Sequence, residues 1–390
     1  MSLYLRSEPD LICFSHLRWN FVFQRPQHLM TRYARVQRVF FVEEPVFDEC
    51  VEPELSVEAQ DGVHVVVPHL PSGWTREQAL AGQRLLLDRL MATRHISSYI
   101  LWYYTPLALA FASHLRPVAT VYDCMDELSA FKGAAAELPA MEQVLLRRAD
   151  VVFTGGQSLF EAKRHQHGNI HALPSSVDVP HFAAARQLGD IQPDQRHLAA
   201  PRLGFFGVLD ERLDLDLLAA VADARPAWQL VMVGPVVKIH PDSLPRRNNI
   251  HYLGPKSYAE LPAYLAGWDV ALLLFARNAA TRFISPTKTP EYLAAGKPVV
   301  STSIRDVVTP YGDLELVRIA DQPLEFVRAC EQALAEPAAS RIAVADAFLQ
   351  SMSWDGTWAK THALVAAACA TPPVLASLPV LPAAEALRMS

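Results

Sequence analysis

A doubly wound α/β fold divided into two domains is the architecture that the sequence predicts. Short apolar runs alternate with longer amphipathic segments, this alternation lapses once near the middle of the chain and then resumes, and the chain has 390 residues. A single core rarely grows beyond about 250–300 residues, so this length favours two domains. Alternating strands and helices indicate parallel sheets that are covered on both faces.

The first half of the chain predicts one such domain, over residues 1–185. Its apolar runs are typical of buried strands, and the segments between several of them have the periodicity of helices. We expect strands at 10–14, 38–42, 63–67, 99–104, 118–122 and 151–155, and helices at 24–35, 76–92 and 138–148.

The alternation lapses in "AAARQLGDIQPDQRHLAAP" (183–201), which is polar, contains Gly and Pro, and has no periodicity. We expect an interdomain linker at 186–201 and a second domain at 202–350. The second domain has expected strands at 202–207, 228–234, 250–254, 269–275, 298–301 and 314–319, and helices at 213–224, 258–266 and 323–335.

A last helix is expected at 351–369, with Ser353 as its N-cap, followed by a flexible tail at 370–390 that is rich in proline.

Composition and charge exclude several classes of protein. The net charge of −6 gives no basic surface for nucleic acid. The five cysteines form no C-x-x-C pair, so neither a zinc site nor a disulfide framework is expected. The beginning of the chain lacks the layout of a signal peptide, and no apolar run reaches 18 residues. We expect a cytoplasmic protein, with peripheral contact at the inner face of the membrane left open.

The most informative stretch is "ISPTKTPEYLAAGKPVV" (284–300), which follows the expected strand at 269–275. Ligands bind beyond the carboxyl ends of strands in such sheets. With Thr287 as N-cap, Pro290 falls in the first turn of a helix, where proline is tolerated, and Gly296 ends it. The helix N-terminus and Lys288 together suit a phosphate, and the Glu291 carboxylate suits the hydroxyls of a ribose. The alternative is an ordinary capped helix with Lys and Glu on its surface.

The segment "SPTKTPEYLAAGKPVVST" (285–302) resembles the nucleotide-sugar motif of GT-B glycosyltransferases, close to family four and the group one glycosyl transferases of bacterial cell-surface polysaccharide assembly. The resemblance implies two Rossmann-like domains that face each other across a cleft, with an acceptor domain first, a donor domain second and a C-terminal helix that crosses back. It implies that Glu291 holds the donor ribose and that Ser285, Thr287 and Lys288 line the donor site. The family often has a second glutamate eight positions before Glu291, where this chain has Phe283.

The resemblance also implies donor-binding roles for residues at other strand ends of the second domain. Gly207 would allow close approach of the backbone, and Arg212 would neutralise the diphosphate, unless it only pairs with Asp210 or Asp214. The remaining candidates are Gly234, Lys238 and Leu253.

The acceptor side is expected in the first domain. His16, Arg18, Trp19 and Arg25 lie around the expected start of the helix at 24–35, and an aromatic face with polar neighbours suits a sugar, although Trp19 is equally suited to a structural role. Asp123 and Asp126 follow the strand at 118–122. Either is a candidate general base, and either is also a candidate N-cap. Asp123 as the base would favour inversion at the anomeric carbon, whereas the family commonly retains configuration.

The sequence therefore predicts a glycosyltransferase that moves a sugar from a nucleotide-diphosphate sugar, with UDP as the expected nucleotide, to a saccharide or lipid-linked acceptor. No cofactor and no metal ion are expected. Two alternatives are a nucleotide-sugar epimerase on the same scaffold, which would turn over donor without acceptor, and a non-catalytic sugar-binding subunit, which would bind no nucleotide.

Overall fold

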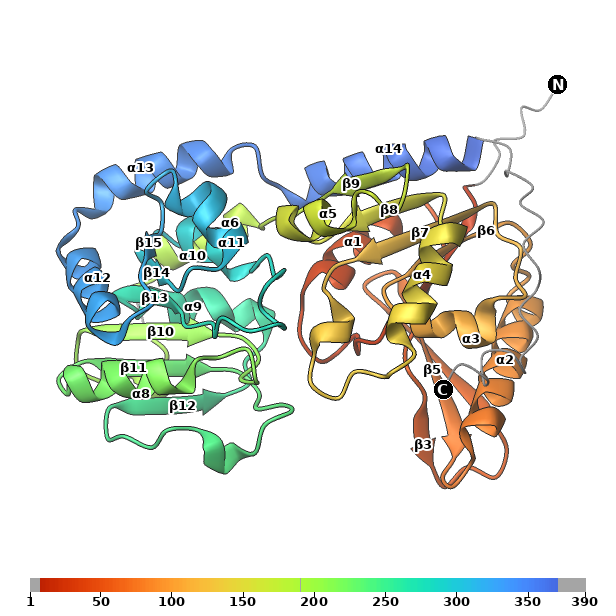
Figure 1. Ribbon diagram of the computed structural model, residues 1–390, viewed down its shortest axis with the longest axis horizontal. Coiled ribbons are helices and arrows are strands. Elements are labelled where there is room, and N and C mark those ends of the chain that lie inside the picture. Colours follow the sequence, from red (N-terminus) through yellow and green to blue (C-terminus); the bar gives the residue numbers. More distant parts are fainter. Residues whose placement is uncertain (1–7, 190, 371–390) are drawn as a thin grey trace.

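The computed structural model describes residues 8–189 and 191–370. Residues 371–390 of the expected tail lie outside the described residues. Two β-sheets with their covering helices lie side by side, and each is formed by one half of the chain (Figure 1). This is the two-domain α/β architecture that the sequence predicts.

The first sheet is parallel except at one edge. Its strand order is β3-β5-β2-β1-β6-β7-β8-β9, and β4 pairs antiparallel with β5. Alternate side chains enter cores on opposite faces of the sheet: Ile12 and Phe14 pack on one side, Leu11 and Cys13 on the other. The strands are β1 (Asp10–Phe14), β2 (Val39–Val42), β3 (Val46–Asp48), β4 (Glu54–Gln60), β5 (Val63–Pro71), β6 (Tyr99–Tyr103), β7 (Ala119–Cys124), β8 (Val151–Thr154) and β9 (Ile170–Ala172).

The second sheet is wholly parallel, with the order β12-β11-β10-β13-β14-β15. Strand order reverses beside β10, and ligands bind at such switch points in doubly wound folds. The strands are β10 (Arg202–Phe206), β11 (Gln229–Val233), β12 (Ile250–Gly254), β13 (Val270–Leu273), β14 (Val299–Ser301) and β15 (Arg318–Ile319).

Some helices begin at recognisable sequence signals. Helix α1 has Pro26 in its first turn, and the backbone amide of its N-cap, Gln24, donates a hydrogen bond of 3.0 Å to Gln27 Oε1. The helices of the first domain are α1 (Arg25–Tyr33), α2 (Arg76–Thr93), α3 (Leu109–Ala112), α4 (Leu138–Arg148) and α5 (Gln157–Lys163). Those that follow are α6 (Val179–Ala183), α7 (Pro193–Arg196), α8 (Leu215–Ala224), α9 (Leu261–Ala266), α10 (Lys288–Ala294), α11 (Arg305–Val307), α12 (Pro323–Ala335), α13 (Ala338–Leu349) and α14 (Trp354–Ala370).

Some elements differ from the prediction. Strands β3, β4 and β9 and helix α13 are not anticipated, because their residues are largely exposed or half-buried and lack a continuous apolar run. The strand expected at 314–319 is reduced to the two residues of β15.

The chain enters the second domain earlier than expected. Val177, Phe182 and Ala185 already pack in the core of the second domain, although the sequence placed them in the first. The linker expected at 186–201 contains α7, which packs on the second domain, since Gln195 Nε2 donates to Tyr264 O (3.0 Å) and Trp268 Nε1 donates to Gln195 Oε1 (3.1 Å).

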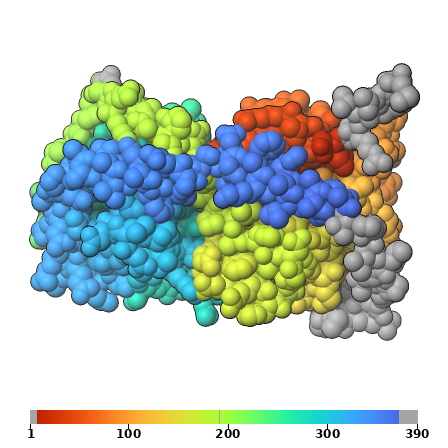
Figure 2. Space-filling model, turned by 90° about the horizontal axis from the view of Figure 1, so that it is seen from above, coloured from red at the N-terminus to blue at the C-terminus, as the bar shows by residue number. Residues whose placement is uncertain are grey.

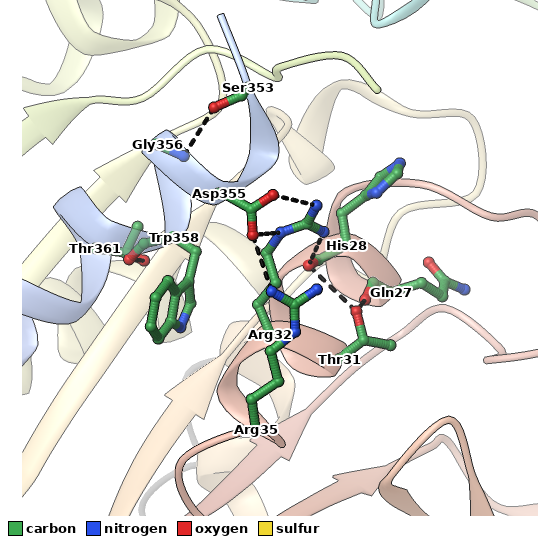
Figure 3. Close-up of polar contacts among 10 residues, drawn as sticks. All are labelled: Gln27, His28, Thr31, Arg32, Arg35, Ser353, Asp355, Gly356, Trp358 and Thr361. Carbon is green, nitrogen blue, oxygen red and sulfur yellow. Dashed lines mark hydrogen bonds and ion pairs between the residues drawn. The ribbon is translucent and has the colours of Figure 1, made fainter. Parts of the chain in front are cut away.

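The C-terminal helix crosses back to the first domain, as the sequence predicts. Figure 2 shows the blue C-terminal stretch running from the second domain onto the first. The Ser353 hydroxyl caps α14 by accepting from Gly356 N at 3.0 Å, and Asp355 pairs with Arg32 of α1 at 3.0 Å and with Arg35, which follows α1, at 2.9 Å (Figure 3). Trp354 stacks on His28, with ring centroids 4.3 Å apart.

Within the described residues, no helix combines the length and the apolar character that crossing a membrane requires.

Candidate active site

A cavity of about 80 Å³ lies between the two domains, beyond the carboxyl ends of their strands. Both domains contribute polar side chains to it. The first provides Arg25 and Asp126, and the second provides Arg212, Ser285, Thr287 and Lys288. This is where doubly wound sheets bind ligands, so the cavity is the candidate site.

Helix α10 brings the motif of residues 284–300 to this cavity. It begins at Lys288 with Thr287 at the N-cap position, although the Thr287 side chain does not cap the helix. Gly296 follows the helix with a φ of 72°, a left-handed conformation that glycine adopts without strain, and its amide bonds to Leu293 O at 2.9 Å. The helix start and stop therefore lie where the sequence predicts them.

Lys288 and Glu291 lie one helical turn apart on α10, and Lys288 is in the cavity wall whereas Glu291 is not. Glu291 is 7% exposed, and burial raises the pKa of its carboxyl, while the Lys288 charge acts in the opposite direction. Burial lowers the pKa of Lys288. Gly207 has a φ of 141°, which is strained for any residue with a side chain, and a Cβ atom there would also displace the end of the Lys288 side chain, so glycine suits this position beside Lys288.

The neighbouring strand ends add two further cations. Asp210 accepts hydrogen bonds from Arg212 Nε and Nη2, with distances of 2.7–3.0 Å, while Asp214 instead caps α8 through Leu217 N. Lys238 lies outside the cavity wall, at the tip of the β11 loop, with its ammonium 4.6 Å from the centre of the Phe131 ring.

The last two donor candidates lie at adjoining strand ends. The Gly234 amide donates to Gly254 O at 2.9 Å, and a Cβ atom at Gly234 would collide with Gly207 O. Leu253 is half-buried near the end of β12 and is not part of the cavity wall.

Asp123 and Asp126, the two candidate bases, have different surroundings. Asp123 is fully buried at the end of β7, and Arg25 Nε donates to both of its oxygens at 3.1 and 2.9 Å. Asp126 lies in the cavity wall. Burial raises its pKa to about 6, against the lowering effect of Arg212, Lys238 and Lys288.

Arg25 is held in position from behind the cavity. Besides Asp123, it bonds through Nη1 to Leu173 O at 2.7 Å. In the part of the chain that the structure describes, its buried Nη2 has no hydrogen-bond partner. Because Arg25 lines the cavity, this group is a donor left over for a ligand.

The other acceptor candidates are not gathered at this cavity. Trp19 is 5% exposed and packs edge-on against Phe41, so it has a structural place in the core. Arg18 pairs with Glu43 at 2.9 Å and lines a separate groove. His16 is half-buried, and burial together with Lys238 lowers its pKa to about 4, which leaves it neutral at pH 7.

Sequence reasoning did not find Phe131, which the structure places against both Arg212 and Lys238. No local pattern marks it, because its partners belong to the other domain. Phe283, which occupies the place of the family's second glutamate, is not in the cavity wall and packs against a core of the first domain.

Two facing α/β domains and a helix that crosses back to the first domain are the architecture of GT-B glycosyltransferases, and Lys288 of the motif helix lies in the wall of the interdomain cavity. Residues 200–336, which form most of the second domain, match the family described as Glycosyl transferases group 1. The chain is thus a glycosyltransferase with the GT-B fold, and its match to this family covers residues 200–336.

Known proteins agree with this placement. A putative teichuronic acid biosynthesis glycosyltransferase, TuaH of Bacillus subtilis, is 27% identical over 274 residues, which cover 64% of this chain and 68% of that protein. Sucrose-phosphate synthase from Thermosynechococcus elongatus has a TM-score of 0.69 at 14% identity, covering 92% of this chain and 99% of that one. Anabaena HepE in complex with UDP and glucose has a TM-score of 0.61 at 16% identity, covering 91% and 99%.

Proposed function

We propose that this glycosyltransferase moves a sugar from a UDP-sugar to a hydroxyl of a saccharide or lipid-linked acceptor in the assembly of a cell-surface polysaccharide. The observation that carries the proposal is the cavity in which Lys288 and Arg212 of one domain face Asp126 of the other. The name of the Bacillus relative supports the polysaccharide, and the bound UDP and glucose in a structural neighbour support the donor.

The second domain supplies the charges that a leaving diphosphate requires. Lys288 and Arg212 line the cavity, so their positive charges stabilise the negative charge that develops as the bond to the sugar breaks. Glu291, one turn into α10, accepts hydrogen bonds from the ribose hydroxyls.

Asp126 is proposed as the general base. It removes the proton from the acceptor hydroxyl while that oxygen attacks the anomeric carbon and the bond from this carbon to the diphosphate oxygen breaks. In this step the acceptor oxygen is proposed to attack from the side opposite the leaving group, which gives inversion. Arg25 orients the acceptor through its unpartnered Nη2, and Asp123 holds Arg25 in place.

The cleft has to widen before the donor enters. Its volume of about 80 Å³ is far below the roughly 300 Å³ or more of typical ligand pockets. An acceptor carried on a lipid would bring the protein to the inner face of the cytoplasmic membrane.

The test is a thermal-shift and calorimetry panel of UDP, ADP, GDP and TDP, followed by incubation of radiolabelled UDP-sugars with membranes from the source cells. We expect UDP to stabilise the protein most and label to enter a saccharide or lipid product. Stabilisation by another nucleotide alone would exclude UDP. Conversion of the donor sugar without acceptor would favour an epimerase, and failure to bind any nucleotide would favour a non-catalytic subunit.

A further inference from the structure

The segment between β7 and α4 connects the reaction side of the first domain to the second domain. It leaves β7 at Cys124, passes Asp126, forms a short 3₁₀ helix (η2, Leu128–Ala130) and continues through Phe131. In Figure 1 this segment lies on the side of the first domain that faces the second. The Lys132 amide, next to Phe131, donates to Glu211 Oε1 of the second domain at 3.4 Å.

The Phe131 ring contacts two cations of the second domain. The Lys238 ammonium lies 4.6 Å from the ring centre, and the Arg212 guanidinium carbon lies 5.6 Å from it. Both distances are within the range of cation–π attraction, which is worth roughly 0.5–2 kcal/mol per contact. One aromatic side chain of the first domain therefore holds two positive charges of the second.

The base of this segment is fixed to the first domain. Glu127 pairs with Lys163 of α5 at 2.8 Å, and Lys163 also pairs with Glu142 of α4 at 2.7 Å. The Lys163 side chain is only 5% exposed, so the ion pairs are shielded from solvent. Because the start of the segment is anchored in this way, Phe131 moves with the first domain.

The two cations depend on the ring to different degrees. Arg212 has a second anchor in Asp210, which accepts from its Nε and Nη2. Lys238 has a left-handed backbone with a φ of 64°, which is strained for a residue with a side chain. Among the described residues, no carboxylate is within ion-pair distance of the Lys238 ammonium, so the ring is its close partner.

We propose that Phe131 is a positioning residue of the donor diphosphate site: its ring holds Arg212 and Lys238 in place, and the complete set of diphosphate cations exists only when the domains are closed. The inference rests on the proposed function and adds to it a residue of the acceptor domain that controls binding to the donor domain. Closure then contributes to donor affinity through cations that only the closed form holds in place.

The test is calorimetry with UDP, inorganic pyrophosphate and uridine on the full chain. Phe131→Leu keeps an apolar side chain but removes the ring, and Phe131→Trp restores an aromatic face. Phe47→Leu is the matched control, because Phe47 is 50% exposed on β3 and outside the cavity wall. We expect Phe131→Leu to weaken the binding of UDP and of pyrophosphate about fivefold to tenfold and to leave the binding of uridine unchanged. The dissociation constant of Phe131→Trp for UDP should lie within about threefold of that of the unmodified protein, and Phe47→Leu should have no effect on it.

A double-mutant cycle with Lys238→Met separates positioning from general damage. If the ring acts through Lys238, the losses in UDP affinity will not multiply in the double variant. Equal or tighter UDP binding by Phe131→Leu, equal losses for UDP and uridine, or fully multiplicative losses would overturn the inference while leaving the proposed donor intact. If the unmodified protein binds neither UDP nor pyrophosphate, the proposed function falls together with the inference.

Discussion

Replacing Asp126 by Asn tests the proposed base with little change of shape. The carboxylate lines the cavity beside Arg212 and Lys288, and the amide that replaces it fills the same space without accepting a proton. Because Asp126 is the negative group opposite the cations, its removal also reduces repulsion toward a bound diphosphate. The dissociation constant for UDP should therefore stay the same or fall.

The expected loss is in turnover. Burial raises the pKa of Asp126 to about 6, so at pH 7 roughly nine-tenths of the groups are ionised and each is a stronger base than an ordinary carboxylate. A positioned general base contributes about 10²–10⁴-fold, which corresponds to roughly 3–5 kcal/mol of the barrier. We expect Asp126→Asn to lower kcat by 10²-fold or more.

The assay is the pH profile of kcat for sugar transfer. In the unmodified protein, kcat should rise with pH through about 6, because the base must be deprotonated, and this rise should be absent from Asp126→Asn.

Asp123→Asn is the matched control. It leaves the buried Arg25 charge uncompensated, so it should cost about 3–5 kcal/mol of stability yet keep the rise near pH 6. Near-normal turnover of Asp126→Asn, or loss of the rise in Asp123→Asn alone, would refute the reasoning.

Three further outcomes are expected. In calorimetry, Lys288→Ala should weaken the binding of UDP far more than the binding of uridine. Glu291→Ala should weaken the binding of both about tenfold or more, since a charge-assisted hydrogen bond is worth roughly 1.5–3 kcal/mol. The same pattern in both variants would contradict the separate phosphate and ribose roles. Transfer should continue in excess chelator, and activity lost with chelator and restored by magnesium or manganese would contradict this. Burial, with Arg32 and His181, lowers the pKa of His28 to about 3. Between pH 6.5, the ordinary pKa of histidine, and about pH 3, the unfolded chain therefore binds more protons at His28 than the folded chain does. The free energy of unfolding should fall by about 1.4 kcal/mol for each pH unit of acidification in this window. Urea titrations at pH 7 and 5 should show a smaller acid loss for His28→Phe, and equal losses would exclude His28 as the source.

The helix that carries the expected donor residues could be predicted from sequence because its signals are local. Thr287, Pro290 and Gly296 mark one short helix, and Lys288 and Glu291 lie within its first turn. Each of these inferences depends on residues a few positions apart, for which backbone preferences are decisive.

The surroundings of the expected acceptor residues could not be predicted in the same way because they depend on distant partners. Asp123 and Asp126 are the same residue type at and just beyond the end of one strand, and the difference between them is Arg25, which lies 98 residues from Asp123 in the chain. Trp19 has the composition of a sugar contact, but Phe41 and the core around it determine that it is buried. Phe131 has its role through residues of the other domain.

The distribution of charge over the two domains links domain closure to the proposed chemistry. The cations that lower the pKa of Asp126 most, Arg212, Lys238 and Lys288, all belong to the second domain, and the burial that raises this pKa comes from the cavity that both domains form. Opening the cleft removes both influences and returns Asp126 to water, where a carboxylate is a weak base with a pKa near 3.9. Closure buries Asp126, and this burial outweighs the opposing effect of the cations, so Asp126 becomes a stronger base in the same arrangement that completes the donor site. When the donor is bound without acceptor, Asp126 is an effective base only in the closed cavity, from which water has been largely excluded. Little water is then available to attack the donor sugar, and this favours transfer over hydrolysis.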